Sequence, residues 1–195
     1  MRRLLAALLR ELESFGEKND RVAKDNSGRM LNITKETGEL FFVLTRALKP
    51  KHILEIGTSN GYSTLWWAEA ARAGGGRVTT VEASEWKISL ARENFRKAGL
   101  ASVITQVHGD GGAVLKKSKP ASFDIIFLDS NKDSYVGWWP DVKRVLRPGG
   151  LLVADNALTH AREMAGFIRL VGKSREFAST IAPVGNGELI AVKRG

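Results

Sequence analysis

Polar side chains capable of chemistry recur in this chain at the ends of apolar runs. Residues 53–61 read Ile-Leu-Glu-Ile-Gly-Thr-Ser-Asn-Gly, an apolar strand followed by a turn that contains Gly57 and Gly61. A glycine in such a turn lets a ligand approach the backbone, because no Cβ stands in the way. A second apolar run ends at Glu82, where nucleoside-binding sheets place the carboxylate that accepts hydrogen bonds from ribose hydroxyls. The two runs predict a site for a nucleoside-containing cofactor.

The Gly57 turn has other interpretations. Three residues separate Gly57 from Gly61, whereas dinucleotide sites carry Gly-x-Gly-x-x-Gly. Residues 57–61 also spell Gly-x-Ser-x-Gly, the nucleophile elbow of serine hydrolases, and Asp129 or Asp155 precedes His160 in the order which that fold requires. The hydrolase hypothesis leaves Glu82 without a role. A tight turn that binds no ligand is the remaining alternative.

Two further strand ends carry oxygen donors. Asp129 follows the run Phe123–Leu128, and Asp155 and Asn156 follow the next run. Two carboxylates and one amide oxygen suit a hard divalent cation such as Mg²⁺ and leave room for water and substrate. Lys132 comes three residues after Asp129, and an amine beside a cation has a lowered proton affinity, so it can act as a general base. Helix capping for the acids and a bare surface position for the lysine are the alternatives.

The elements that must position these residues alternate between strand and helix patterns. The expected strands and helices are listed here: strands His52–Ile56, Arg77–Glu82, Val103–His108, Phe123–Leu128, Gly150–Asp155, Ala178–Pro183 and Glu188–Lys193; helices Tyr62–Ala73, Ser84–Ala98, Ala113–Lys117, Trp138–Leu146 and Ala161–Lys173. Asn186-Gly187 is a hairpin signal, so we expect the last two strands to be antiparallel. The pattern predicts an α/β, Rossmann-like, seven-stranded and mostly parallel sheet with helices on both faces. Ligands then bind at the carboxyl ends of the strands.

The first 48 residues precede the sheet. Helical spacing of apolar residues predicts helices over Arg2–Phe15 and Thr34–Leu48, and the polar stretch Gly16–Asn32 between them reads as a loop, either a lid over the site or a plain connector. We expect one domain over residues 1–195, with 1–48 supplying helices and a lid and 49–195 forming the cofactor-binding sheet.

The amino-acid composition excludes several classes of protein. Hydrophobic residues make up 43% of the 195 residues and charged residues 26%, as in ordinary globular domains. The absence of cysteine excludes disulfides and thiolate metal sites and fits a reducing compartment, so we expect a cytoplasmic protein. No apolar run approaches the length of a membrane span. The formal charge of +9 is spread along the chain, which suits a solvated surface or a polyanionic partner.

Taken together, these segments resemble the class I S-adenosylmethionine-dependent O-methyltransferases, and within them the metal-dependent catechol and caffeoyl-CoA O-methyltransferase-like family. The resemblance covers about residues 30–193. It rests on Leu54-Glu55-Ile56-Gly57-Thr58-Ser59-Asn60-Gly61-Tyr62-Ser63, Val81-Glu82, Gly109-Asp110, Phe127-Leu128-Asp129-Ser130-Asn131-Lys132 and residues 147–156.

The resemblance implies roles for individual residues. It places S-adenosylmethionine against the following set: Met30, Glu55, Gly57, Thr58, Ser59, Gly61, Tyr62, Ser63, Glu82, Ala83, Gly109, Asp110, Gly111 and Asp129. It implies a metal site of Asp129, Asp155 and Asn156 for Mg²⁺ or another divalent cation, and Lys132 as the general base beside the catalytic Asp129. Met30 belongs to the segment that closes over the methyl donor.

The implied reaction is methyl transfer to a hydroxyl of a catechol-like or other vicinal-oxygen small molecule. Two departures bear on the substrate: no acid stands around residues 179–180, and Asn131 replaces a tryptophan. Relatives that methylate hydroxyuridine in tRNA suggest an alternative, and the positive charge motivates it. The resemblance also implies a homodimer.

Overall fold

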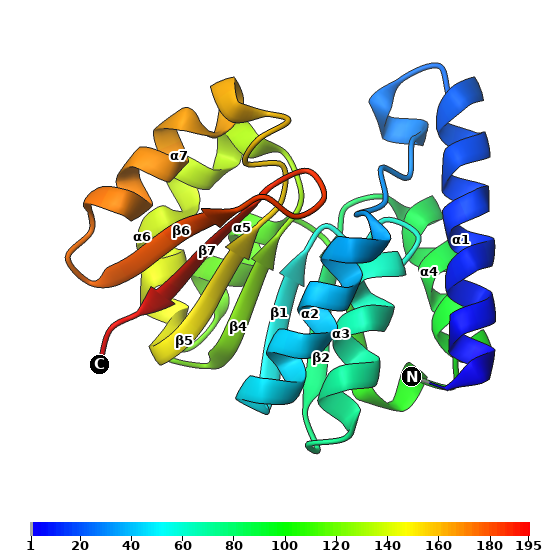
Figure 1. Cartoon of the computed structure of the whole chain (residues 1–195), viewed down its shortest axis with the longest axis horizontal. Coiled ribbons are helices and arrows are strands. Elements are labelled where there is room, and N and C mark those ends of the chain that lie inside the picture. Colours follow the sequence, from blue (N-terminus) through cyan, green and yellow to red (C-terminus); the bar gives the residue numbers. More distant parts are fainter. Residues whose placement is uncertain (1) are drawn as a thin grey trace.

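The computed structural model describes residues 2–195 and contains one seven-stranded sheet of order β3-β2-β1-β4-β5-β7-β6 (Figure 1). Strands β1 to β5 are parallel, whereas β7 runs antiparallel to both β5 and β6. The α/β fold class expected from the sequence is therefore confirmed. The strands are β1 (His52–Ile56), β2 (Arg77–Glu82), β3 (Ile104–His108), β4 (Phe123–Leu128), β5 (Leu146–Ala154), β6 (Phe177–Ala182) and β7 (Glu188–Lys193).

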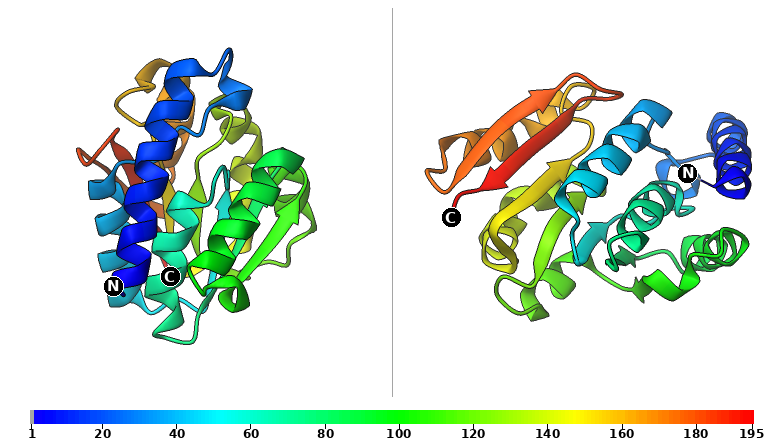
Figure 2. Two further views of the ribbon diagram at one scale, coloured as in Figure 1. Left: turned by 90° about the vertical axis from the view of Figure 1, so that its right-hand side faces the viewer. Right: turned by 60° about the horizontal axis from the view of Figure 1, so that its bottom comes forward.

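Helices cover both faces of this sheet (Figures 1 and 2). Their bounds are α1 (Arg3–Val22), α2 (Lys35–Leu48), α3 (Tyr62–Arg72), α4 (Glu85–Lys97), α5 (Gly111–Lys117), α6 (Tyr135–Val145) and α7 (Ala161–Lys173). Helices α1 to α4 share one hydrophobic cluster, and α5 to α7 share the other. Neighbouring strand residues alternate between the clusters: Ile53 and Phe127 belong to the first, and Leu54 and Leu128 to the second. The strands are apolar on both faces for this reason.

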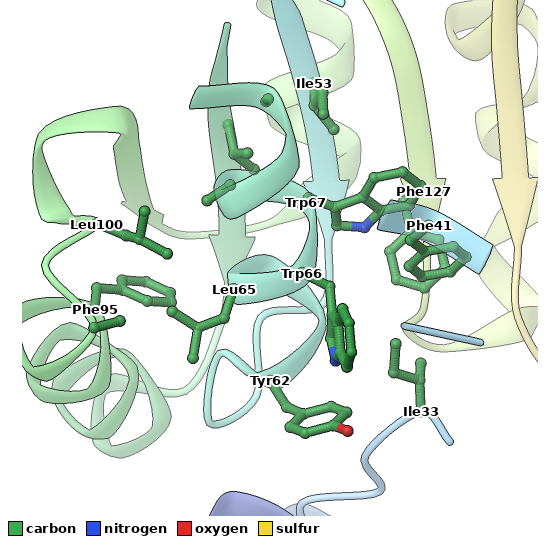
Figure 3. Close-up of a cluster of buried hydrophobic side chains, with 14 of the residues drawn as sticks. Ile33, Phe41, Ile53, Tyr62, Leu65, Trp66, Trp67, Phe95, Leu100 and Phe127 are labelled. Atoms are coloured by element: carbon green, nitrogen blue, oxygen red, sulfur yellow. The ribbon is translucent and has the colours of Figure 1, made fainter. Parts of the chain in front are cut away.

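Aromatic rings fill the first cluster between α2, α3 and the centre of the sheet (Figure 3). Phe41 of α2 stacks on Trp67 of α3 with ring centroids 4.1 Å apart, and its edge meets Phe127 of β4 at 4.8 Å. These contacts fix α2 against the sheet beside the carboxyl ends of the strands.

The amino-terminal segment differs from expectation. Helix α1 continues to Val22 through much of the expected loop, and a short 3₁₀ turn follows at Asn26–Gly28. Gly16, a helix-weakening residue, is buried inside α1, where a Cβ would lie 2.6 Å from Asn32 Nδ2. Glycine leaves room there for Asn32, whose Nδ2 donates a hydrogen bond to the Leu12 carbonyl of α1 at 3.1 Å and helps to offset the low helix propensity of glycine.

Strand β5 also starts earlier than Gly150. Leu146 pairs with Phe123 of β4, and the ladder then shifts its register before Ile125. This irregularity accommodates Pro148 near the start of the strand. Helix α6 correspondingly runs from Tyr135 to Val145 rather than from Trp138 to Leu146. The other boundaries lie within two residues of those expected. Among residues 2–195, no helix has the length and apolar character needed to cross a bilayer.

Candidate functional site

A cavity of about 1050 Å³ opens at the carboxyl ends of the parallel strands. It receives residues from the ends of β1 to β5 and from the segment before α2. Most of the candidate residues line it: Met30, Gly57, Thr58, Ser59, Tyr62, Ser63, Glu82, Ala83, Gly109, Asp110, Gly111, Asp129, Lys132 and Asn156. Three candidates, Glu55, Gly61 and Asp155, do not line the cavity but lie behind its wall.

The Gly57 turn joins the first strand to the fourth. Gly57 has φ +106°, and its amide donates a hydrogen bond to the Val81 carbonyl of β2. A Cβ at this position would lie 1.9 Å from the Asp129 carbonyl oxygen. Only glycine satisfies both conditions, since side chains are disfavoured at this φ and no space exists for one. The turn therefore brings the cofactor loop into contact with the start of the Asp129 loop.

Glu55 stands behind this turn and is fully buried. Three hydroxyls donate to its carboxyl group, from Ser63 at 2.6 Å, Thr80 at 2.6 Å and Thr64. Burial raises the pKa of Glu55 to about 7 although these hydrogen bonds act in the opposite direction. Glu55 thus anchors the first turn of α3, and Ser63 is the member of this group that also reaches the cavity.

Glu82 at the end of β2 faces the cavity. Its two carboxylate oxygens accept hydrogen bonds from the backbone amides of Ser59, at 2.9 Å, and Ser84, at 3.0 Å. Each oxygen has a second lone pair, so the carboxylate can also accept from two neighbouring hydroxyls of a ligand. The geometry suits ribose.

The region of the cavity next to Glu82 has a flat wall formed by an aromatic ring. Asp110 caps α5 by accepting from the Ala113 amide at 2.7 Å. The Trp138 ring of α6 lies against the first turn of α5, where a Cβ on Gly112 would come within 2.5 Å of its Nε1. Trp138 also lines the cavity, so it supplies a planar wall beside Asp110 that suits a nucleobase.

The segment of residues 29–33 closes another side, and three elements hold its backbone. Asp20 of α1 accepts from the amides of Met30, at 2.6 Å, and Leu31, at 2.8 Å. Ser59 donates to the Met30 carbonyl at 2.7 Å, and Lys87 of α4 donates to the carbonyl of residue 29 at 2.6 Å. Partial burial alone would raise the pKa of Asp20, but its hydrogen bonds outweigh burial and lower that pKa. Residues 29–33 thus lie along one side of the cavity, the position in which a lid is expected.

The opposite end of the cavity contains the β4 and β5 residues. Lys132 Nζ lies 3.2 Å from Asp129 Oδ1, and both side chains are mostly shielded from solvent. Asn156 has φ +71°, and its amide and Nδ2 both donate to Asp155, at 2.6 and 3.1 Å. Asp155 itself is only 1% exposed. Burial, and next the charge of Asp129, raises the pKa of Asp155.

A further acid, missed in the sequence, touches this group. Glu188 is the first residue of β7 and is fully buried. It accepts a hydrogen bond from Thr37 of α2 at 3.2 Å and lies beside Asp155, one residue beyond the Ala154–Leu189 pair of the β5–β7 ladder. Burial, and next the charge of Asp155, raises the pKa of Glu188 strongly. Its position follows from the antiparallel register of β5 and β7, in which Ala154 pairs with Leu189 and Glu188 therefore lies beside Asp155.

Within the described part of the chain, no group of three or more His, Cys, Asp or Glu side chains is arranged to hold a metal ion. The oxygen donors expected from the sequence at this end are two carboxylates, Asp129 and Asp155, together with the Asn156 amide, and Glu188 lies beside Asp155. Their donor types fit a hard divalent cation, and the mutual repulsion of the carboxylates is what such a cation would relieve.

Comparison with known proteins gives consistent results. The family model described as O-methyltransferase matches residues 7–166. The chain is similar to a catechol O-methyltransferase of Niastella koreensis, with 33% identity over 66% of this chain and 59% of the relative. A catechol O-methyltransferase of Mycobacterium tuberculosis is 32% identical over 65% of this chain and 57% of the relative. The matches thus span less than two thirds of these relatives.

Among solved structures, the O-methyltransferase from Bacillus cereus in complex with SAH is similar with a TM-score of 0.80 and 26% identity, over 96% of this chain and 91% of the other. The family match extends from α1 into α7 and includes every residue proposed from the sequence for cofactor, metal and base. The chain therefore belongs to the O-methyltransferase family, in agreement with the resemblance of its motifs.

Proposed function

We propose that the chain transfers a methyl group from S-adenosylmethionine to a hydroxyl oxygen of a catechol-like or other vicinal-oxygen small molecule, assisted by Mg²⁺ or another divalent cation. One observation carries the proposal. A single cavity runs from Glu82 at the end of β2, past the central Gly57 turn, to Asp129, Lys132 and Asn156 at the ends of β4 and β5. A methyl donor and an acceptor oxygen bound at the two ends would be neighbours.

The comparisons support each half of this proposal separately. The Bacillus cereus relative was solved with SAH, which is the demethylated form of the proposed cofactor. Two relatives are named catechol O-methyltransferase, which supports an acceptor with adjacent oxygens. The oxygen donors of Asp129, Asp155 and Asn156 support a hard cation.

The residues of the chain then have distinct tasks. Gly57 and Glu82 hold the donor, and the lid segment with Met30 shields it from water. In its neutral form Lys132 Nζ accepts the proton of the substrate hydroxyl, and Asp129 orients the amine. The resulting oxyanion takes the methyl group as the bond between that carbon and the sulfonium sulfur breaks, and SAH is released. When bound, the divalent cation supplies positive charge that lowers the pKa of the acceptor hydroxyl. Holding both reactants in line can contribute roughly 7–11 kcal/mol to lowering the barrier.

The serine hydrolase hypothesis has little support. The Ser59 hydroxyl donates to the Met30 carbonyl, and no histidine within residues 2–195 hydrogen-bonds to it. Without a base beside it, a serine hydroxyl is a weak nucleophile.

Two partner proposals accompany the activity. We expect a homodimer, since α1 and α2 expose large apolar side chains, Leu4 at 64% and Val43 at 62%. The alternative substrate, a hydroxyuridine in tRNA, rests on the +9 charge, because phosphate contacts dominate the affinity for nucleic acids.

A methyl-transfer screen tests the proposal. Purified protein and labelled S-adenosylmethionine are incubated with catechols, phenolic acids, aliphatic vicinal diols and bulk tRNA, each with Mg²⁺ or with excess EDTA. We expect label in at least one vicinal-oxygen compound, and only with the cation. Label in tRNA at low salt, lost as salt rises, would favour the alternative. Equal labelling in EDTA would refute the role of the cation.

A further inference from the structure

Glu188 is buried at a place where the proposed mechanism gives it no task. It has no exposed surface, it begins β7, and its side chain points toward the space between α2 and the end of β5. A buried carboxyl group is costly unless its oxygens have partners. Its position therefore calls for an explanation beyond packing.

Its contacts are few and specific. Thr37 Oγ1 donates to Glu188 Oε1 at 3.2 Å, whereas Oε2 receives no hydrogen bond from any N–H or O–H donor in the described residues. The remaining polar neighbour is Asp155, which lies beside Glu188 one residue beyond the Ala154–Leu189 pair of the β5–β7 ladder.

The surrounding backbone maintains this contact. The β6–β7 turn passes so close to the start of α2 that a Cβ on Gly185 would lie 2.3 Å from Thr37 Oγ1. Thr34 caps α2 by accepting from the Thr37 amide, so Thr37 cannot move independently of the helix. The Asn156 amide and Nδ2 hold Asp155 from the other side. Asp155 is thus clamped between Asn156 and the pair formed by Glu188 and Thr37.

We propose that Glu188, held by Thr37, is a positioning residue that fixes the Asp155 carboxylate for the divalent cation. The inference rests on the proposed function, since it assigns Asp155 to that cation. Groups that hydrogen-bond to metal ligands typically change metal affinity by about 10- to 100-fold when removed. Glu188 does not touch the cofactor end of the cavity, so its effect is confined to the cation.

Mn²⁺ is the probe, and its free concentration is followed by electron paramagnetic resonance while the protein is titrated. We expect Glu188→Leu to weaken Mn²⁺ binding by about tenfold or more. Glu188→Gln keeps the shape of the side chain and its contacts with Thr37 and Asp155, and should retain most of the affinity. Affinity for SAH, measured by calorimetry on the same samples, should stay at the wild-type value in both variants.

Thr37→Val and Thr45→Val form a matched pair on α2. Both threonines are buried, but Thr45 Oγ1 has no hydrogen-bond partner among residues 2–195 and lies about two turns of α2 away from Thr37. We expect weaker Mn²⁺ binding for Thr37→Val and unchanged binding for Thr45→Val.

The outcomes separate the two proposals. If the wild-type protein binds no Mn²⁺, both the cation assignment and the role of Glu188 are wrong. If wild type binds Mn²⁺ and Glu188→Leu binds it equally well, only the role of Glu188 is refuted. Equal loss of SAH and Mn²⁺ affinity in Glu188→Leu and Glu188→Gln would indicate a structural role and would also overturn the inference.

Discussion

The carboxylates at the two ends of the cavity differ in how many hydrogen-bond donors and positive charges surround them. At the cofactor end, protein donors satisfy the acids: Glu82 receives two backbone amides, and Glu55 receives three hydroxyls. At the other end, Asp129 has one ion pair with Lys132 and Asp155 accepts two hydrogen bonds from Asn156, but a third carboxyl group, Glu188, lies beside Asp155 and has one oxygen without a donor among residues 2–195. At the cofactor end the carboxylates have enough hydrogen-bond donors to stabilise their charge. At the other end the carboxyl groups outnumber the positive charges that could stabilise them.

This difference indicates that the two ends of the cavity have different requirements for a bound cation. A site whose hydrogen bonds are already made keeps its shape with or without ligand, because its groups need not reorganise. A site with surplus buried carboxylates is stabilised by a cation, which lowers the cost of keeping them charged. We therefore expect cofactor affinity to be insensitive to metal ions and turnover to depend on them.

The largest effect is expected from removing a proposed cation ligand. Asp155→Ala should lower kcat/KM in Mg²⁺ by about 1000-fold or more, because charge stabilisation by a metal ion contributes several kcal/mol. The variant should retain its affinity for SAH. Initial rates in Mg²⁺ and in EDTA check this, and wild-type activity of the variant in chelator would contradict the assignment.

Removing the proposed base comes next. Lys132→Met should lower kcat by roughly 100-fold or more, the usual contribution of general base catalysis, with little change in SAH affinity. Lys97→Met is the control, because Lys97 also forms an ion pair with a carboxylate three to four residues away but lies on the surface of α4. Equal kcat values for the two variants would remove Lys132 from the mechanism.

The burial of Glu55 at the cofactor end predicts a pH dependence of the free energy of unfolding. The pKa of Glu55 is about 7 in the folded protein and has an ordinary value near 4.5 when unfolded. Between these values the folded state binds more protons, so Glu55 makes the free energy of unfolding fall as pH rises through that window. Glu55→Gln should remove up to about 3 kcal/mol of this decrease.

Urea unfolding between pH 4 and 8 measures the free energy of unfolding for both proteins in metal-free buffer. The two curves should diverge as pH rises, with the variant becoming relatively more stable. Parallel curves would show that Glu55 does not titrate in this range.

The smallest effect concerns the lid. Ser59→Ala removes the hydrogen bond to the Met30 carbonyl, which is worth about 1 kcal/mol, and should weaken SAH binding by about fivefold. Ser122→Ala, which removes a hydrogen bond to the Lys119 carbonyl outside the cavity, serves as the control. Calorimetry with SAH compares them, and equal affinities would mean that Ser59 does not secure the lid in the bound state.

Most of the sheet could be predicted from sequence because its strands are apolar on both faces and end in polar turns. β1, β2, β4 and β7 have the expected bounds. The site residues followed from the same logic, since parallel strand ends meet at one edge of a sheet. The cavity brings Gly57, Glu82 and Asp129 together as that logic requires.

What the sequence did not reveal depends on contacts between distant segments. The extension of α1 past Gly16 depends on Asn32, and the early start of β5 depends on its pairing with Phe123. Glu188 was missed because its significance depends on the β5–β7 register and on Thr37, 151 residues away. No local pattern at Glu188 distinguishes a buried acid from one at an exposed strand end.

The central claim, that the two ends of the cavity are separable, has a direct measurement. SAH and Mn²⁺ affinities are determined by calorimetry for wild type, Glu82→Gln and Asp155→Ala. The account predicts that Glu82→Gln weakens SAH by about tenfold and leaves Mn²⁺ unchanged, while Asp155→Ala abolishes Mn²⁺ binding and leaves SAH unchanged. Loss of both ligands in either folded variant, or Mn²⁺ binding that survives in Asp155→Ala, would contradict it.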